Sequence, residues 1–305
     1  MDITEIIKGA WQIVKKERAT WQLGLLTYLI SGLFGMLSFH FTPQTNGHQP
    51  WLRDLDWSKS HPELGLAIGS AFLIIFIILY YISLVSQGAL ILSIEEKETG
   101  EGNHFNTARL SYKKGRLYAA RLAGTDILIN GSLLIITALL SLPLIVMYVR
   151  YSHTISPSVA LATLAALAVF LLCIPLYIYG FLLNMVAKRF VVVQKKPVAV
   201  ALRCAFKLMR KQFANLFQAG LVSFFIEGST SIAIAILIWL SVLFALITGT
   251  FVYYILHTPG AVAYGIVIGL GLLMLILLIV SLKKAYFSAY WTMVFLATDY
   301  LSKQA

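Results

Sequence analysis

Long apolar runs recur along the whole chain, and no other feature of the sequence constrains the fold as strongly. Six such segments can be placed, at residues 20–39, 64–94, 120–149, 158–187, 214–256 and 260–301. Because about 20 helical residues cross the hydrocarbon core of a bilayer, these runs predict an all-α integral membrane protein with six transmembrane helices. The last two segments are about twice that length, so they must tilt, break or continue outside the bilayer.

The composition agrees with a membrane as the solvent for most of the chain. Hydrophobic residues make up 59% of the sequence and charged residues only 12%, whereas soluble domains contain roughly 25% charged residues. The net charge is +11, and the basic residues lie in short segments between the apolar runs. This pattern favours anionic lipid headgroups, and not nucleic acid, as the partner of the basic segments.

The distribution of Lys and Arg predicts the orientation in the membrane. Of these residues, 21 lie before the first apolar segment, in residues 95–121 and 188–211, and from Lys283 onward, while only Arg53, Lys59 and Arg150 lie in the alternate loops. Cationic segments stay on the cytoplasmic side. We therefore expect a multi-pass protein of the prokaryotic cell (inner) membrane with both termini in the cytoplasm. The N-terminal residues lack a cleavage site, so the first apolar helix should remain as an anchor.

The three cytoplasmic segments that precede the odd-numbered helices share one pattern, an apolar and basic helix that ends in paired cations. Setting Ala10, Ala108 and Ala205 as equivalent aligns these pairs five and six residues further on, without a gap. The pairs are Lys15 with Lys16, Lys113 with Lys114, and Arg210 with Lys211. Such a helix is expected to lie in the membrane interface with its cations at the lipid headgroups, although a soluble partner could use the same surface.

A polar residue followed by glycine lies 21 or 22 residues after each of these alanines. The three pairs are Ser31-Gly32, Asn130-Gly131 and Glu227-Gly228. Together with the basic helices, they predict a single membrane domain over residues 1–305 that consists of three repeats, at 1–95, 96–190 and 191–305. Each repeat is an amphipathic helix followed by a hairpin of two spanning helices.

Glycines in apolar segments usually let helices approach closely, so we expect a packing role for Gly32, Gly131 and Gly228. Gly265 and Gly269 form a G-x-x-x-G pair in the last segment and are assigned the same role. The three polar residues before the repeat glycines suggest a second interpretation. Ser31, Asn130 and Glu227 could meet near a pseudo-three-fold axis and form a polar cluster that handles a solute or a proton.

Glu227 is the strongest candidate in that cluster, because it lies well inside an apolar segment and charges within the membrane are costly. The alternative is a structural pair with Lys283 or Lys284, or a carboxyl group kept neutral by desolvation. Asp126 and Asp299 lie near the ends of their segments and are assigned to the interface.

The sequence contains no phosphate-binding loop, no arrangement typical of a nucleophilic catalyst and no paired carboxylates. Five of its six histidines fall on the predicted outer side without the spacing of metal ligands. We therefore expect no enzymatic activity, no cofactor and no metal site.

Three stretches resemble a known group of proteins. They are the residues from Arg189 to Arg210, the segment that begins Gly88-Ala-Leu-Ile-Leu-Ser-Ile together with Phe105-Asn-Thr-Ala-Arg, and the aromatic-rich tail from Ala289 to Leu301. They are similar to the YciC-like group and to the membrane domain found beside glycerophosphoryl diester phosphodiesterases. The resemblance implies a multi-pass fold and supplies no activity, because no segment here has the length or polarity of the catalytic domain.

The sequence thus leads to two functional hypotheses. The first is a non-enzymatic structural or assembly subunit of a membrane complex. The second is a permease or channel-like transport subunit with a polar site near Glu227. In both cases the expected partners are anionic membrane lipids, other membrane subunits or a cytoplasmic protein, and no nucleic acid.

Overall fold

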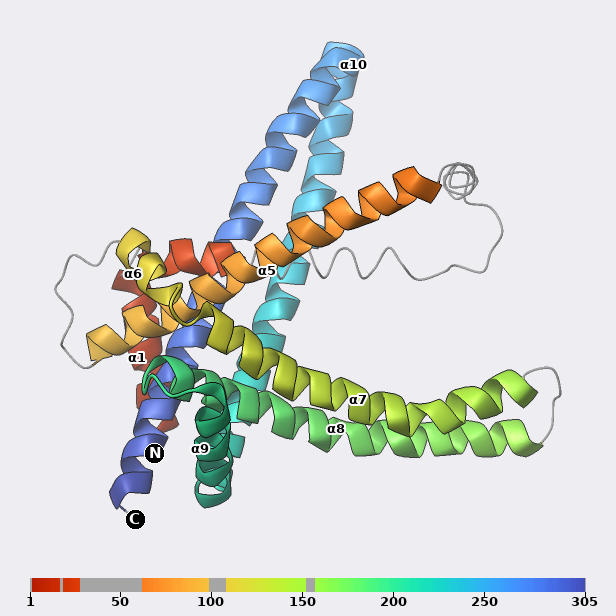
Figure 1. The fold of residues 1–305 in the computed structure, drawn as a ribbon. Coiled ribbons are helices and arrows are strands. Elements are labelled where there is room, and N and C mark those ends of the chain that lie inside the picture. The colour runs from red at the N-terminus through yellow and green to blue at the C-terminus, as the bar shows by residue number, and fades with distance from the viewer. Residues whose placement is uncertain (1, 17–18, 28–61, 99–107, 152–156, 305) are drawn as a thin grey trace.

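The computed structural model describes residues 2–16, 19–27, 62–98, 108–151 and 157–304, and these residues are helical apart from short turns (Figure 1). Residues 19–27 form one helical segment. The other helices are α1 (Ile3–Lys16), α5 (Pro62–Glu98), α6 (Ala108–Gly115), α7 (Ala119–Tyr151), α8 (Pro157–Val192), α9 (Val198–Lys211) and α10 (Phe213–Gln304).

Five helical stretches in the described residues are long and apolar enough to cross a membrane. They are Gly69–Glu98, Ala119–Pro143, Leu164–Val192, Phe213–Ile255 and Val262–Tyr300. The chain is therefore a multi-pass helical membrane protein. The first expected segment, 20–39, lies largely outside the described residues, so the count of six spanning helices stays a prediction.

Helix α10 is a hairpin whose two arms meet at His257, where φ is 56° and ψ is −162°. Each arm is continuous, and the two spanning stretches contain 43 and 39 residues. At 1.5 Å per residue each arm is about 60 Å long, or twice the thickness of the hydrocarbon core. Each of the two long apolar segments is therefore one unbroken helix that is longer than the hydrocarbon core is thick.

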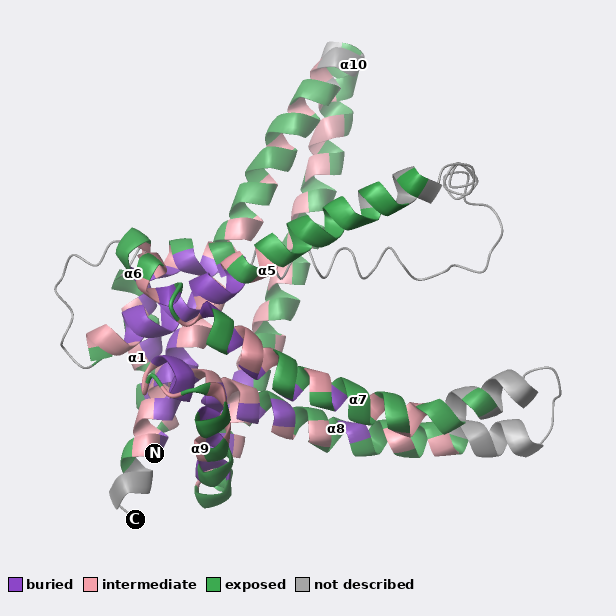
Figure 2. Ribbon diagram, viewed as in Figure 1, coloured by how far each residue is buried: buried purple, intermediate pink, exposed green. Residues whose placement is uncertain are grey.

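The long helices diverge from a common hub, which consists of α1, α6, α9 and the ends of the long helices beside them (Figure 1). Buried residues concentrate in the hub, while the arms expose most of their surface (Figure 2). The exposed arm residues are apolar and include Phe224, Trp239 and Met274. Such a surface suits contact with lipid chains, because hydrocarbon solvates apolar side chains.

Each short helix packs on a long helix that approaches the hub. Helix α6 packs on α5, α9 packs on α8, and α1 packs on α10. In α1 the buried residues are Ile6, Ala10 and Val14, at the four-residue spacing that keeps one face of a helix against its support. The same spacing recurs in α9, where Ala201, Ala205 and Met209 are buried.

The closest helix contacts involve glycines that differ from the predicted ones. A Cβ atom at Gly24 would overlap the α10 backbone at Ser281, and one at Gly115 would overlap the α5 backbone at Val85 and Ala89. Glycine is required at these two positions because only a bare backbone fits there.

The predicted packing glycines that the structure describes are Gly131, Gly228, Gly265 and Gly269. A Cβ atom at any of them meets nothing within 4 Å. They make no close helix contact inside the described chain, so their packing role stays a prediction for contacts with other molecules. Gly32 lies outside the described residues.

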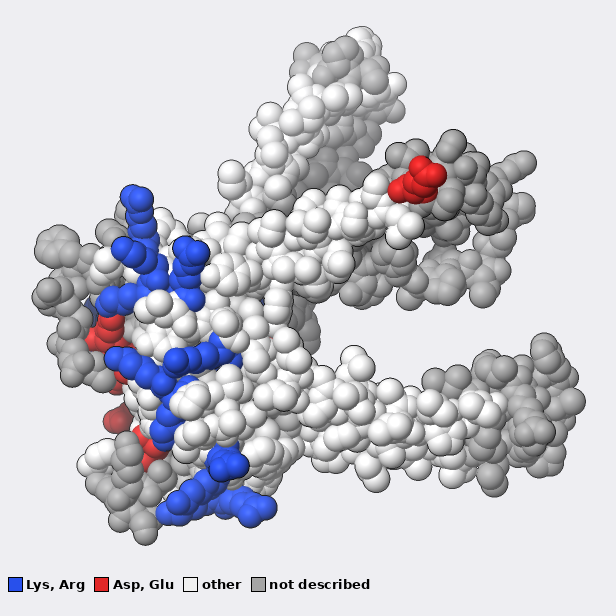
Figure 3. Space-filling view, viewed as in Figure 1, with Lys and Arg blue, Asp and Glu red and all other residues white. Residues whose placement is uncertain are grey.

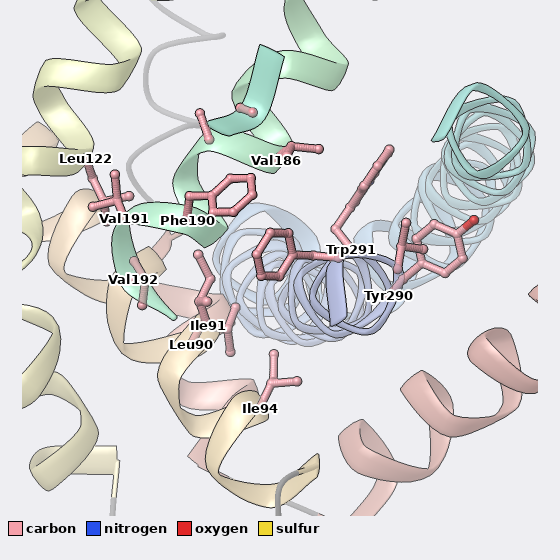
Figure 4. Packing of buried hydrophobic residues seen from close by; sticks show 14 of the residues in the cluster. Leu90, Ile91, Ile94, Leu122, Val186, Phe190, Val191, Val192, Tyr290 and Trp291 are labelled. Carbon is pink, nitrogen blue, oxygen red and sulfur yellow. The ribbon is translucent and has the colours of Figure 1, made fainter. Parts of the chain in front are cut away.

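Three long helices meet in the core of the hub. Leu90 and Ile91 of α5, Phe190 of α8 and Trp291 of α10 belong to one cluster of buried apolar residues (Figure 4). The ring of Phe190 also packs edge-on against Phe295, with the ring centroids 4.9 Å apart. The buried cluster as a whole packs α5, α8 and the second arm of α10 together beside the polar residues described below.

Candidate functional site

A cavity of about 230 Å³ lies where α5, α8 and both arms of α10 leave the hub. That volume holds several water molecules, each of which takes about 30 Å³. The charged residues that line the cavity are Lys188, Arg189, Lys283, Lys284 and Glu227. Four cations and one carboxylate therefore gather at one cavity beside long apolar helices.

Lys188 is neutralised by a carboxylate on a neighbouring helix. Its Nζ atom lies 2.8 Å from Oδ1 of Asp126, and the side chains of the two residues are 12% and 13% exposed. Asn184 donates a hydrogen bond of 2.9 Å to the same carboxylate oxygen. Lys188 also donates to Oε1 of Gln87 at 3.1 Å. This polar network connects α5, α7 and α8. Asp126 therefore has a buried ion-pair partner.

Arg189 is buried and has no carboxylate partner in the part of the chain that the structure describes. It is 4% exposed, and its guanidinium donates to the carbonyl oxygen of Met185 at 2.8 Å. Its Nε atom is buried and bonds to no other group of the described chain. The two ion pairs among the described residues are Lys114 with Glu96 and Lys188 with Asp126. A buried charge without a counter-charge costs several kcal/mol, so this guanidinium favours an anion in the cavity.

Lys283 contacts the backbone carbonyl group of Glu227 and not its carboxylate. Its Nζ atom donates to Oγ of Ser231 at 2.6 Å and to the carbonyl oxygen of Glu227 at 3.3 Å. Among the described residues, no ion pair within 4 Å involves the Glu227 carboxylate. Lys284 lies close enough to Lys188 to repel its charge. When only the described residues are counted, Asp126 and Glu227 stand against four cations, and two positive charges remain at the cavity.

The structure does not bring the described members of the predicted polar cluster together. Glu227 lines the cavity, whereas Asn130 is exposed on α7 and is not among the residues that line it. Ser31 lies outside the described residues. The cavity instead collects its polar groups mainly from helices that approach the hub, such as Gln87 of α5 and Lys188 of α8.

The predicted headgroup cations lie on the hub. Lys and Arg side chains gather there in Figure 3, while the described parts of the arms in this view are almost free of them. Lys15, Lys16, Lys113, Arg210 and Lys211 are exposed. The remaining member of the set, Lys114, forms an ion pair with Glu96 of α5. Contact of these residues with lipid headgroups stays a prediction.

Sequence reasoning missed the central residues of the cavity. It counted Lys188 and Arg189 as part of a basic cytoplasmic segment, and it gave no weight to Gln87 inside an apolar run. The signal that could have found them is a Lys-Arg pair followed directly by the apolar stretch Phe190-Val191-Val192, because these cations sit inside a spanning helix.

An apolar groove of about 520 Å³ adjoins the cavity, between α8 and the first arm of α10. Phe181, Ser223 and Glu227 line both spaces. Beyond them the groove is lined by side chains such as Tyr177 and Leu221, which are 46% and 42% exposed. The charged cavity and the apolar groove along the arms therefore share part of their walls.

The part of the chain that the structure describes contains no group of three or more His, Cys, Asp or Glu residues that could hold a metal ion. Comparison with protein-family models, with curated proteins and with solved structures gave no match for this chain. The resemblance to the YciC-like group therefore stays a prediction. The cavity is the feature of the structure that bears on function.

Proposed function

We propose that the protein is a non-enzymatic multi-pass membrane subunit that binds an anionic ligand in the cationic cavity of its hub. The observation that carries this proposal is Arg189, a buried guanidinium whose only hydrogen-bond partners among the described residues lie in Met185. Arg presents a planar set of donors that matches a phosphate or carboxylate group. An anion bound there would supply the missing charge, and Lys284 would contribute to the same field.

Ligand binding suits the permease-like hypothesis better than a purely structural role. An inert scaffold gains nothing from a buried guanidinium such as Arg189, because a buried charge without a counter-charge destabilises a fold. In this proposal, Glu227 lies at the junction of the cavity and the groove and limits which anions can enter.

A structural or assembly role remains the second candidate function. It is supported by the described arms, which expose large apolar side chains such as Trp239 and Phe244 over most of their length. Such surfaces can pack against other membrane helices as well as against lipid. The glycines whose Cβ atom would meet nothing within 4 Å in the described chain, such as Gly131 and Gly228, would then lie at contacts with another subunit.

We also propose that the hub faces the cytoplasm of a prokaryotic cell and that the chain consists of three related units. The gathering of cations at the hub (Figure 3) supports the orientation through the positive-inside rule. The shared burial pattern of α1 and α9 supports the repeat. In α6 the buried residues are Ser111 and Gly115. When Ala108 is aligned with Ala10 and Ala205, this buried face lies one residue earlier than the corresponding face of α1 and α9.

The test is native mass spectrometry of the full-length protein purified in mild detergent. We expect the wild type to carry a bound anionic species, and the Arg189→Gln and Lys284→Gln variants to lose it. The matched control is Lys211→Gln, which removes the same charge from the exposed surface of α9 and should retain the species. If the wild type carries no anion and none of several added anions binds, the proposal is wrong.

A further inference from the structure

We propose that the ligand is a phosphate-bearing lipid, with its phosphate in the cationic cavity and one acyl chain in the groove between α8 and the first arm of α10. This inference rests on the proposed anion binding and adds the chemical class of the ligand. It follows from three observations: the charge left over in the cavity, the residues that line both the cavity and the groove, and the distance of the cavity from the turn of α10.

The uncompensated charge identifies the headgroup. After the pairing of Lys188 with Asp126, the cavity keeps Arg189, Lys283 and Lys284 against Glu227. Two positive charges remain, and a phosphate monoester carries about −1.5 to −2 at pH 7. A phosphodiester carries one negative charge and neutralises half of the excess. The charge balance therefore favours a lipid with a terminal phosphate group.

The groove provides for the chain of the same molecule. It begins at Phe181, Ser223 and Glu227, which also line the cavity, and it continues over apolar side chains of α8 and α10. A soluble anion such as inorganic phosphate has no apolar part that could contact this surface. A lipid whose phosphate occupies the cavity can place its acyl chain in the groove, because the two sites are adjacent.

The distance from the cavity to the turn of α10 matches the thickness of a bilayer. About 30 residues separate Glu227 from the turn of α10 at His257, and about 26 separate Lys283 from it, which corresponds to roughly 40 to 45 Å along the helix. A bilayer is about 40 to 45 Å thick when its headgroup regions are included. A hairpin whose turn lies at one membrane surface therefore places the cavity near the opposite headgroups.

The experiment measures dissociation constants by native mass spectrometry of the full chain after delipidation. The four probes are short-chain phosphatidic acid, phosphatidylglycerol, phosphatidylcholine and inorganic phosphate. We expect phosphatidic acid to bind most tightly, at least about tenfold more tightly than phosphatidylcholine or inorganic phosphate. Arg189→Gln and Lys284→Gln should each weaken it by about tenfold, because one charged hydrogen bond contributes about that factor.

Filling the groove separates the lipid inference from the proposed function. Leu221→Trp should weaken phosphatidic acid by about tenfold and leave inorganic phosphate unchanged, since about 50 Å² of lost apolar contact corresponds to that factor. Leu243→Trp, on the same arm but outside the groove, is the matched control and should change neither. If inorganic phosphate binds as tightly as the lipid and Leu221→Trp has no effect, the lipid inference is wrong and anion binding stands. If the two cation variants change no affinity, both proposals are wrong.

Discussion

The ion pair between Asp126 and Lys188 gives the most quantitative test of the hub. Its atoms are 2.8 Å apart and both side chains are largely buried, so at an effective dielectric constant of about 20 their attraction is about 6 kcal/mol before desolvation is subtracted. Removing one partner of a buried pair typically costs 3 to 5 kcal/mol, because the other charge is left uncompensated. We expect Asp126→Asn to lower the free energy of unfolding by about 3 kcal/mol.

A double-mutant cycle isolates the pair from its surroundings. Lys188→Met alone should also destabilise the fold, while the double variant should return to within about 1 kcal/mol of the wild type, since a neutral pair of similar volume replaces two buried charges. Unfolding of the delipidated protein by SDS in mixed micelles, followed by circular dichroism, measures all four forms. A loss below about 0.5 kcal/mol for Asp126→Asn, or additive effects in the double variant, would refute the reasoning.

Three further predictions use the same unfolding assay. Gly115→Ala should destabilise the protein by about 2 kcal/mol, because its Cβ atom overlaps the α5 backbone. Gly131→Ala, which meets nothing within 4 Å, should stabilise it by about 0.5 to 1 kcal/mol; equal signs for the two would contradict the packing. Tyr290→Phe should cost about 1 kcal/mol, since the buried hydroxyl donates to the carbonyl oxygen of Ala219 at 2.9 Å; no loss would argue against this bond. Arg189→Gln should leave the delipidated protein equally or more stable, whereas a loss of about 3 kcal/mol would indicate an internal partner.

The spanning helices could be predicted from the sequence because their signal is local. A run of apolar residues has only a few ways to satisfy its backbone in lipid, and a helix is the one available to a single segment. Five of the six predicted segments correspond to long helices of the structure. The length of the last two segments also indicated that their helices must tilt, break or continue outside the bilayer, although not where the turn would lie.

The cavity could not be predicted because its residues are distant in the sequence. Gln87 and Lys188 are about 100 residues apart in the sequence, and so are Lys188 and Lys284. They meet only because α5, α8 and α10 pack together in the hub. Glu227 could be identified because an acidic residue inside an apolar run is conspicuous by itself. Asp126 was assigned to the interface for its position near the end of a segment, and its partner on α8 was not visible from spacing.

Photolabelling would show whether an anionic lipid occupies the cavity and the adjoining groove. Phosphatidic acid with a diazirine on its acyl chain would be crosslinked to the reconstituted full-length protein and mapped by peptide mass spectrometry. We predict labels at residues 174–182 of α8 and 217–227 of α10, which line the groove, and their loss in Arg189→Gln. Even labelling along the exposed arms, including residues 232–247, with no change in the variant would contradict the claim.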